Sequence, residues 1–174
     1  MRAQAEVAMT MIAQEMRVRA RVIVPGLYRP GRRSPTCTAM TDLPDVSLSS
    51  SSAFVQGCGL VVDSIAADEV TGHIDAGAGH HTPWGVVHGG VYATAIESAC
   101  SIGASAAVAA DGAFAVGLSN HTDFVRAHRE GRLDVRAAPV HQGRTGQLWA
   151  CDITREDGKL VAQGRVRLQN VPRP

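Results

Sequence analysis

The chain has 174 residues, of which 45% are apolar and only 4% aromatic, and its formal net charge is +1. This length suits one domain with a single core, and the balanced charge argues against a nucleic-acid partner, because such proteins usually present a clustered basic face. Four cysteines without C-x-x-C spacing predict reduced thiols and a cytoplasmic location.

The first 40 residues differ in composition from the rest. They hold seven arginines against two glutamates, and all five methionines of the chain. We expect residues 1–44 to be an extension, either disordered or the product of a start codon placed upstream of a true start at Met40; an amphipathic helix and a transit peptide are alternatives. The domain is expected over residues 45–174, after a Ser-rich linker at 45–52.

Short β-like runs follow the linker. Leu60–Val62 and Val70–Ala76 predict two early strands. A loop rich in Gly, His and Pro spans residues 77–85 and leads into the longest helical stretch, residues 89–109. That helix is apolar nearly all round, which predicts a buried position. No apolar run is expected to approach the roughly 18 residues that cross a bilayer, so we expect no membrane partner.

Four further strands are predicted after the helix, and turn signals separate them. Their ranges are residues 114–125, 133–141, 147–154 and 160–170. The last one alternates, with Leu160, Ala162, Val166 and Leu168 on one face and polar residues on the other. Short connections between the strands favour an antiparallel α+β domain in which one sheet covers one helix.

The chemistry is concentrated where the loop becomes the helix. The pair Gly89-Gly90 lies at the helix start, where free N–H groups can hold an anion or a developing oxyanion. At 100° per residue, Gly90, Glu97 and Ser101 fall within about 20° of one face. An oxyanion donor and a carboxylate form a minimal set for acyl transfer to water, and a thioester suits it because a thiolate leaves readily. The chain has no G-x-S-x-G motif to compete with it.

Four sequence blocks resemble a known family. They are Gly85-Val-Val-His-Gly-Gly with Glu97, Asn120 to Arg126, His141 to Arg144, and Asp157 to Gly164. Together they are similar to the hotdog thioesterases of the phenylacetyl-CoA and 4-hydroxybenzoyl-CoA group, over about residues 55–170. The resemblance implies a hotdog fold, in which an antiparallel sheet wraps one long helix. It also implies that two subunits join their sheets and that each active site lies at the subunit interface.

The same resemblance implies roles for individual residues. It makes the Gly89 N–H the donor to the thioester carbonyl, Glu97 the nucleophile or general base, and Ser101 a hydroxyl that helps to place water. Thr82 is a departure, because the family often has Asn or Gln there, although its hydroxyl could still donate one hydrogen bond.

Substrate-binding roles are also expected for four further residues. His88 is expected to hydrogen-bond the backbone of the turn, beside Gly90, and Arg126 and Arg144 could meet the phosphates of coenzyme A. The histidines near the loop lack metal-ligand spacing, so we expect no metal.

These features predict an acyl-CoA thioesterase that needs no bound cofactor and forms a homodimer or a dimer of dimers. A hotdog dehydratase is a weaker alternative, since those enzymes typically use an Asp and His pair that Glu97 does not reproduce. A non-catalytic acyl-thioester binding module is the alternative from another class, and Thr82 is its best support. The acyl group, and the choice between a covalent anhydride and an activated water, stay open.

Overall fold

A computed structural model describes residue 48 and residues 51–173 of the chain. The predictions for the extension at residues 1–44, including a start at Met40, lie outside the described residues. The described part begins with a short helix, α2 (Ala53–Gln56), which we did not predict; the Ser52 side chain accepts a hydrogen bond from the Val55 N–H at its start.

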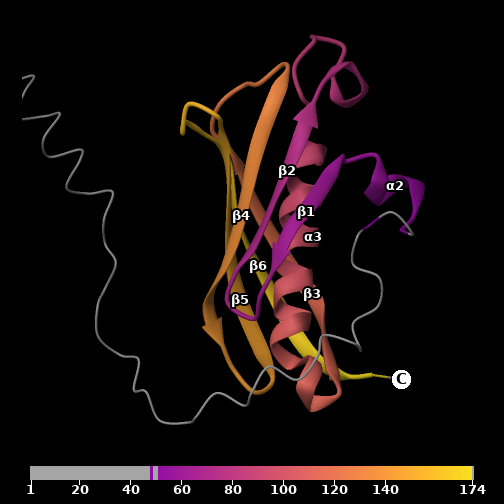
Figure 1. The fold of residues 1–174 in the computed structure, drawn as a ribbon, viewed down its shortest axis with the longest axis vertical. Helices are drawn as coiled ribbons and strands as arrows, with labels where there is room; N and C mark the ends of the chain where they lie inside the picture. Colours follow the sequence, from indigo (N-terminus) through magenta and orange to yellow (C-terminus); the bar gives the residue numbers. More distant parts are fainter. Residues whose placement is uncertain (1–47, 49–50, 174) are drawn as a thin grey trace, which may run out of the picture. The chain divides into compact units, whose positions relative to one another are not determined.

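Six strands and one long helix form the domain (Figure 1). The strands are β1 (Leu60–Ile65), β2 (Val70–Ala76), β3 (Ala113–Phe124), β4 (Gly131–Gln142), β5 (Gly146–Arg155) and β6 (Leu160–Pro172). The helix is α3 (Gly89–Val108), flanked by two single 3₁₀ turns, η1 (Ala78–His80) and η2 (Ala109–Asp111). All neighbouring strands are antiparallel, in the order β1-β2-β4-β5-β6-β3. This is the predicted α+β hotdog fold.

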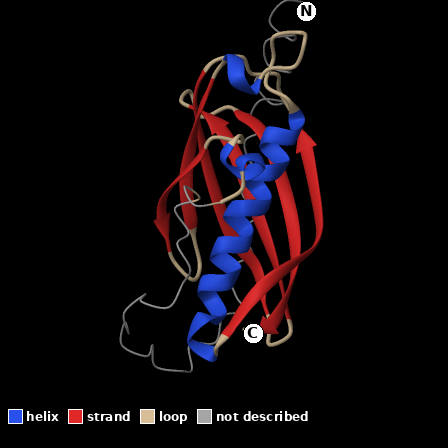
Figure 2. Ribbon diagram, turned by 90° about the vertical axis from the view of Figure 1, so that its right-hand side faces the viewer, coloured by secondary structure: helices blue, strands red, loops and turns tan. Residues whose placement is uncertain are grey.

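The sheet packs along one side of α3, and all six strands contact the helix (Figure 2). In β6, the side chains of Ala162, Val166 and Leu168 are buried against it, while the alternate residues Gln163, Arg165 and Arg167 are exposed. Leu160 is only half-buried. The predicted alternation is therefore confirmed from Ala162 onward.

The prediction that α3 is buried all round holds only for the side that faces the sheet. Its buried residues are Tyr92, Ala95, Ile96, Ala99, Cys100, Ile102, Gly103 and Ala104. The opposite side, including Glu97 and Ser101, is half-buried within one chain. By length and composition, the 23 residues Gly89–Asp111, with mean hydropathy 1.3, could cross a membrane, so the prediction that no segment approaches this length is wrong. The segment nevertheless packs on the sheet as a core helix does.

Gly103 provides a test of how closely α3 and the sheet pack. A Cβ added there would lie 2.5 Å from Cη2 of Trp149, whose ring is fully buried and whose Nε1 donates to Gln147. We expect Gly103→Ala to destabilise the fold, because overpacking costs about 1–3 kcal/mol and outweighs the gain in helix propensity of about 1 kcal/mol.

Urea unfolding checks this expectation. Gly79→Ala is the control, since a Cβ at Gly79 meets nothing within 4 Å. A Gly103→Ala protein as stable as the parent would contradict the packing described here.

Candidate active site

The N-terminus of α3 is capped by a histidine. His88 has extended backbone angles (φ −68°, ψ 136°), and its Nδ1 accepts the Gly90 N–H at 2.9 Å. This hydrogen bond confirms the turn role predicted for His88 and places the proton of the neutral ring on Nε2. Gly90 thus has its N–H occupied. Among the described residues none accepts the Gly89 N–H, which stays available at the positive end of the helix dipole.

The loop before the helix is a closed turn. The Thr82 N–H donates to the Val86 carbonyl at 2.7 Å, and the Gly85 N–H donates to the Thr82 carbonyl at 2.9 Å. The Thr82 hydroxyl oxygen is buried and has no hydrogen-bond partner among the described residues. A buried hydroxyl without a partner is costly. The Thr82 hydroxyl is therefore available to donate a hydrogen bond to a bound molecule or to accept one from it.

The Glu97 carboxylate lies between α3 and β3 and receives two hydrogen bonds. Asn120 Nδ2 donates to its Oε2 at 3.0 Å, and Ser101 Oγ donates to its Oε1 at 3.5 Å. The Thr122 hydroxyl donates to Asn120 Oδ1 at 2.7 Å, so the amide must turn its NH₂ group toward Glu97 and the Ala93 carbonyl. The helix and the strand together fix the orientation of the carboxylate.

A β-bulge makes this contact possible. The register of β3 against β6 shifts between Gly117 and Ser119, so Leu118 is an extra residue in the strand. Before the bulge, Ala115 and Gly117 face the helix; after it, Asn120, Thr122 and Phe124 do. Because side chains alternate with a period of two, the extra residue exchanges the two faces of the strand.

Gly117 leaves the space that the carboxylate occupies. A Cβ on Gly117 would collide with Oε1 of Glu97. The oxygen therefore lies directly on the backbone of β3, and a side chain at 117 would force the carboxylate to move from this position. The sequence signals for Asn120 and Gly117 were weak: both fall in or beside a block that resembles the family, but nothing in the pattern assigned them a role.

Two aromatic rings close the other end of the site. The Phe124 ring packs on Gly89, where an added Cβ would lie 2.5 Å from Cε2, and its centroid is 6.0 Å from that of Tyr92. The Tyr92 hydroxyl is buried without a partner among the described residues. Burial raises the pKa of Tyr92 to about 12.

The two arginines predicted to bind substrate lie at opposite ends of the sheet. Arg126 follows β3 near Phe124, and its guanidinium donates to the Leu160 carbonyl. Arg144 lies in the β4–β5 turn, beside Asn170, at the end where Gln147 of β5 donates to the Ala104 carbonyl. That end belongs to the C-terminal half of α3, so a single chain does not bring Arg144 to Gly89.

Gly89 and Glu97 also lie apart within one chain. They are eight residues apart on α3, which corresponds to about 12 Å along the helix axis. The predicted convergence of oxyanion donor and carboxylate on one carbonyl is therefore not achieved by a single copy.

The three cysteines among the described residues are not placed to act as nucleophiles. Cys58, Cys100 and Cys151 are buried and unpaired. A hydrogen bond with Cys151, together with burial, raises the pKa of Cys100, which keeps it a neutral thiol. Among residue 48 and residues 51–173, no three His, Cys, Asp or Glu side chains gather closely enough to hold a metal ion.

The chain is similar in sequence to known hydrolases. The sequence profile of the thioesterase superfamily matches residues 85–162. A Mycobacterium tuberculosis protein provisionally named an esterase is 47% identical over 89 residues, half of this chain and 64% of that relative's length. A 1,4-dihydroxy-2-naphthoyl-CoA hydrolase from Listeria monocytogenes is 33% identical over 85 residues, which cover 49% of this chain and 68% of the relative.

Solved structures share the fold. The structure of the same M. tuberculosis protein superposes with a TM-score of 0.67 at 40% identity, covering 70% of this chain and 98% of that one. A thioesterase from Haemophilus influenzae gives a TM-score of 0.66 at 30% identity, over 72% of this chain and 86% of the other.

The buried phenol of Tyr92 predicts a loss of stability at alkaline pH. An unfolded tyrosine ionises near pH 10, whereas the folded one holds its proton until about pH 12. Above pH 10 the unfolded state therefore binds fewer protons than the folded one, and stability falls as pH rises toward 12. Tyr92→Phe should remove this part of the loss.

Urea unfolding of both proteins below and above about pH 10 measures the effect. Other groups titrate in both proteins and cancel in the comparison. If stability falls in parallel in the two proteins, burial does not perturb Tyr92.

Proposed function

Because the chain belongs to the thioesterase superfamily, we propose that it hydrolyses acyl-coenzyme A thioesters to a carboxylic acid and coenzyme A. The observation that carries the proposal is the Glu97 carboxylate, half-buried on Gly117 and oriented by Asn120 and Ser101. The name of the Listeria relative, a hydrolase of an aromatic acyl-CoA, supports a CoA ester as substrate.

The chemistry needs three contributions from the protein. The Gly89 N–H, with Nε2–H of His88 as a second donor beside it, stabilises the negative charge that develops on the carbonyl oxygen. Glu97 either attacks the carbonyl carbon or takes a proton from the water that attacks it, and Ser101 helps to hold that water. If water attacks, the C–S bond breaks, the thiolate leaves and is protonated by the proton that Glu97 took, and the acid retains the oxygen of water. If Glu97 attacks, loss of the thiolate leaves a mixed anhydride, which a water molecule then hydrolyses to the free acid and the Glu97 carboxylate.

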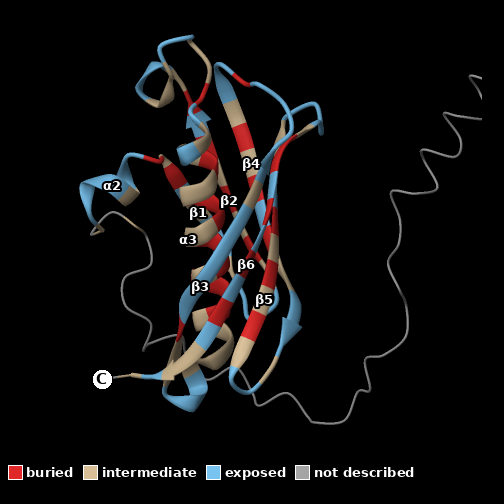
Figure 3. Ribbon diagram, turned by 180° about the vertical axis from the view of Figure 1, so that it is seen from behind, coloured by how far each residue is buried: buried red, intermediate tan, exposed pale blue. Residues whose placement is uncertain are grey.

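A second copy of the chain supplies the group that a single copy lacks at each site. Gly89 and Glu97 are separated by about 12 Å along α3, so we place Gly89 of one copy opposite Glu97 of another. β3 is one of the two edge strands of the described sheet and is largely exposed, including Leu118 (56%) and Phe124 (58%) (Figure 3). An exposed apolar edge of this length is a ready pairing surface.

The direction of pairing follows from β3 itself. Phe124 marks the Gly89 end of the site, and the bulge at Leu118 marks the Glu97 end. If two β3 strands pair antiparallel about a two-fold axis near His121, Phe124 of one copy lies opposite Leu118 of the other. Both sites of such a dimer are then complete.

We expect Glu97→Gln to lower kcat by about 10²-fold or more, because general acid–base groups contribute about 10²–10⁴. Thiol release from a panel of aromatic and straight-chain acyl-CoAs measures the rate. Glu69→Gln is the control: it removes a carboxylate of the β1–β2 turn whose one ion-pair partner among the described residues is Arg136. Equal rates in parent and Glu97→Gln would favour the non-catalytic binding module instead.

Mixed dimers test the two-copy site. Gly89→Pro removes the N–H donor while keeping the helix, since proline is favoured at the first helical position; the Phe124 ring, which packs on Gly89 and is 58% exposed, must shift to admit the proline ring. In a dimer of one Gly89→Pro chain and one Glu97→Gln chain, purified with two different tags, one site is intact and the other carries both changes. We expect about half of the parent activity. If both groups act within one chain, the mixed dimer stays inactive.

A further inference from the structure

An open pocket of about 920 Å³ lies beside the start of α3. Three segments far apart in the sequence line it: residues 81, 85 and 86 before the helix, residues 127–132 where the β3–β4 connection enters β4, and residues 155–157 at the end of β5 and in the turn after it. The first two are tied together, because the Val87 N–H donates to the His128 carbonyl at 2.9 Å and His81 Nε2 donates to the Arg129 carbonyl at 2.7 Å.

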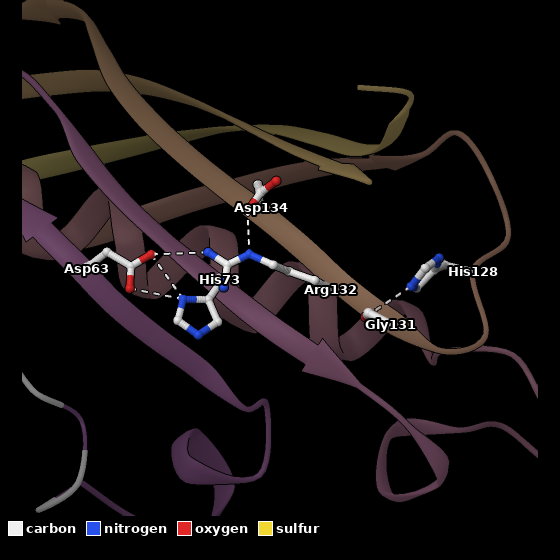
Figure 4. Close-up of polar contacts among 6 residues, drawn as sticks. All are labelled: Asp63, His73, His128, Gly131, Arg132 and Asp134. Carbon is white, nitrogen blue, oxygen red and sulfur yellow. Dashed lines mark hydrogen bonds and ion pairs between the residues drawn. The ribbon is translucent and has the colours of Figure 1, made fainter. Parts of the chain in front are cut away.

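Two of the three arginines on this pocket are already engaged. Arg132 Nε donates to Asp134 at 2.9 Å, and its Nη2 lies 3.6 Å from Asp63 (Figure 4). The Arg155 guanidinium donates to both carboxylate oxygens of Asp157, at 2.6 and 3.2 Å. Their charges are largely compensated within the protein.

Arg129 is different. Its backbone carbonyl accepts a hydrogen bond from His81, which anchors the residue. Its guanidinium forms no hydrogen bond or ion pair with any described residue. The guanidinium lies over Gly85, where a Cβ would be 3.5 Å from Nη1. A guanidinium whose donors are all free, on a residue whose backbone is fixed, is suited to a phosphate, which it can bind with two parallel hydrogen bonds.

The carboxylates of the pocket suit a sugar. Glu130 and Glu156 line it, and neither forms an ion pair with a described residue. Beside a phosphate-binding arginine, carboxylates can accept hydrogen bonds from ribose hydroxyls, as acidic residues do in dinucleotide-binding folds. A phosphorylated nucleoside would therefore suit the whole pocket, with its phosphate on the arginine and its ribose hydroxyls on the carboxylates.

The pocket also lies within reach of the reaction centre. Val86 lines it and is three residues from Gly89, so their Cα atoms are at most about 11 Å apart. A ligand bound in the pocket could thus extend a flexible arm to the N-terminus of α3.

We propose that this pocket binds the phosphorylated nucleotide of coenzyme A, with Arg129 as the phosphate ligand, so that the enzyme selects free CoA thioesters over thioesters on a carrier protein. This inference rests on the proposed thioesterase function. It assigns the phosphate role to Arg129, whereas the sequence analysis named Arg126 and Arg144, of which Arg144 lies at the other end of the sheet.

The test compares one acyl group on two carriers. Coenzyme A carries the nucleotide, and N-acetylcysteamine has a thiol but no phosphate or nucleoside. We expect Arg129→Ala to raise KM for the CoA ester about tenfold or more, to leave its kcat near the parent value, and to leave the N-acetylcysteamine ester unaffected. Arg167→Ala, which removes an exposed arginine of β6 outside the pocket, should change neither.

A binding measurement supplies a readout that does not depend on turnover. Adenosine 3′,5′-bisphosphate should bind the parent in a calorimetric titration and bind Arg129→Ala at least about tenfold more weakly.

The outcomes separate this inference from the proposed function. If the parent hydrolyses neither ester, the thioesterase proposal fails. Four other outcomes would contradict the nucleotide site while thioester hydrolysis stands. The parent could hydrolyse both esters with the same kcat/KM, or prefer a carrier-protein thioester. Arg129→Ala could affect both esters equally or neither, or the bisphosphate could bind both proteins alike.

Discussion

The half-buried carboxylate of Glu97 constrains the structure around it. A carboxylate removed from water needs donors and space, or its burial is too costly. Asn120 and Ser101 supply the donors, and Gly117 supplies the space. These groups come from both α3 and β3, so the helix and the edge strand must meet in one register for the acid to be accommodated.

The sequence predicted the elements well because their signals are local. The length and apolar character of α3 and the alternation of β6 each arise from a single segment. The bulge at Leu118 has no such signal: a strict period of two cannot show whether Ser119 or Asn120 faces the helix. Asn120 and Gly117, which contact Glu97 from β3, were therefore beyond prediction, although Glu97 and Ser101 were not. The same reasoning explains Arg129, whose pocket exists only where three distant segments meet.

The proposed pairing of two copies accounts for features that one chain leaves unexplained. β3 exposes apolar side chains along a free edge, and Glu97 lies two turns from the helix start. A monomer that presents such an edge risks association with wrong partners. Joining two β3 edges would cover the apolar residues and complete both sites with the same contact.

At the bulge, the way β3 pairs with β6 matters more than which side chain stands at position 118. Leu118 is exposed, and a different side chain there has room in the isolated chain. Loss of the bulge with Leu118 kept in the strand is another matter, because regular alternation would then turn Asn120 and Thr122 outward and bring His121 and Asp123 against the helix. Selection on this strand should therefore act on the bulged pairing, which sets the face of every residue after position 118, more strictly than on the side chain at 118 itself.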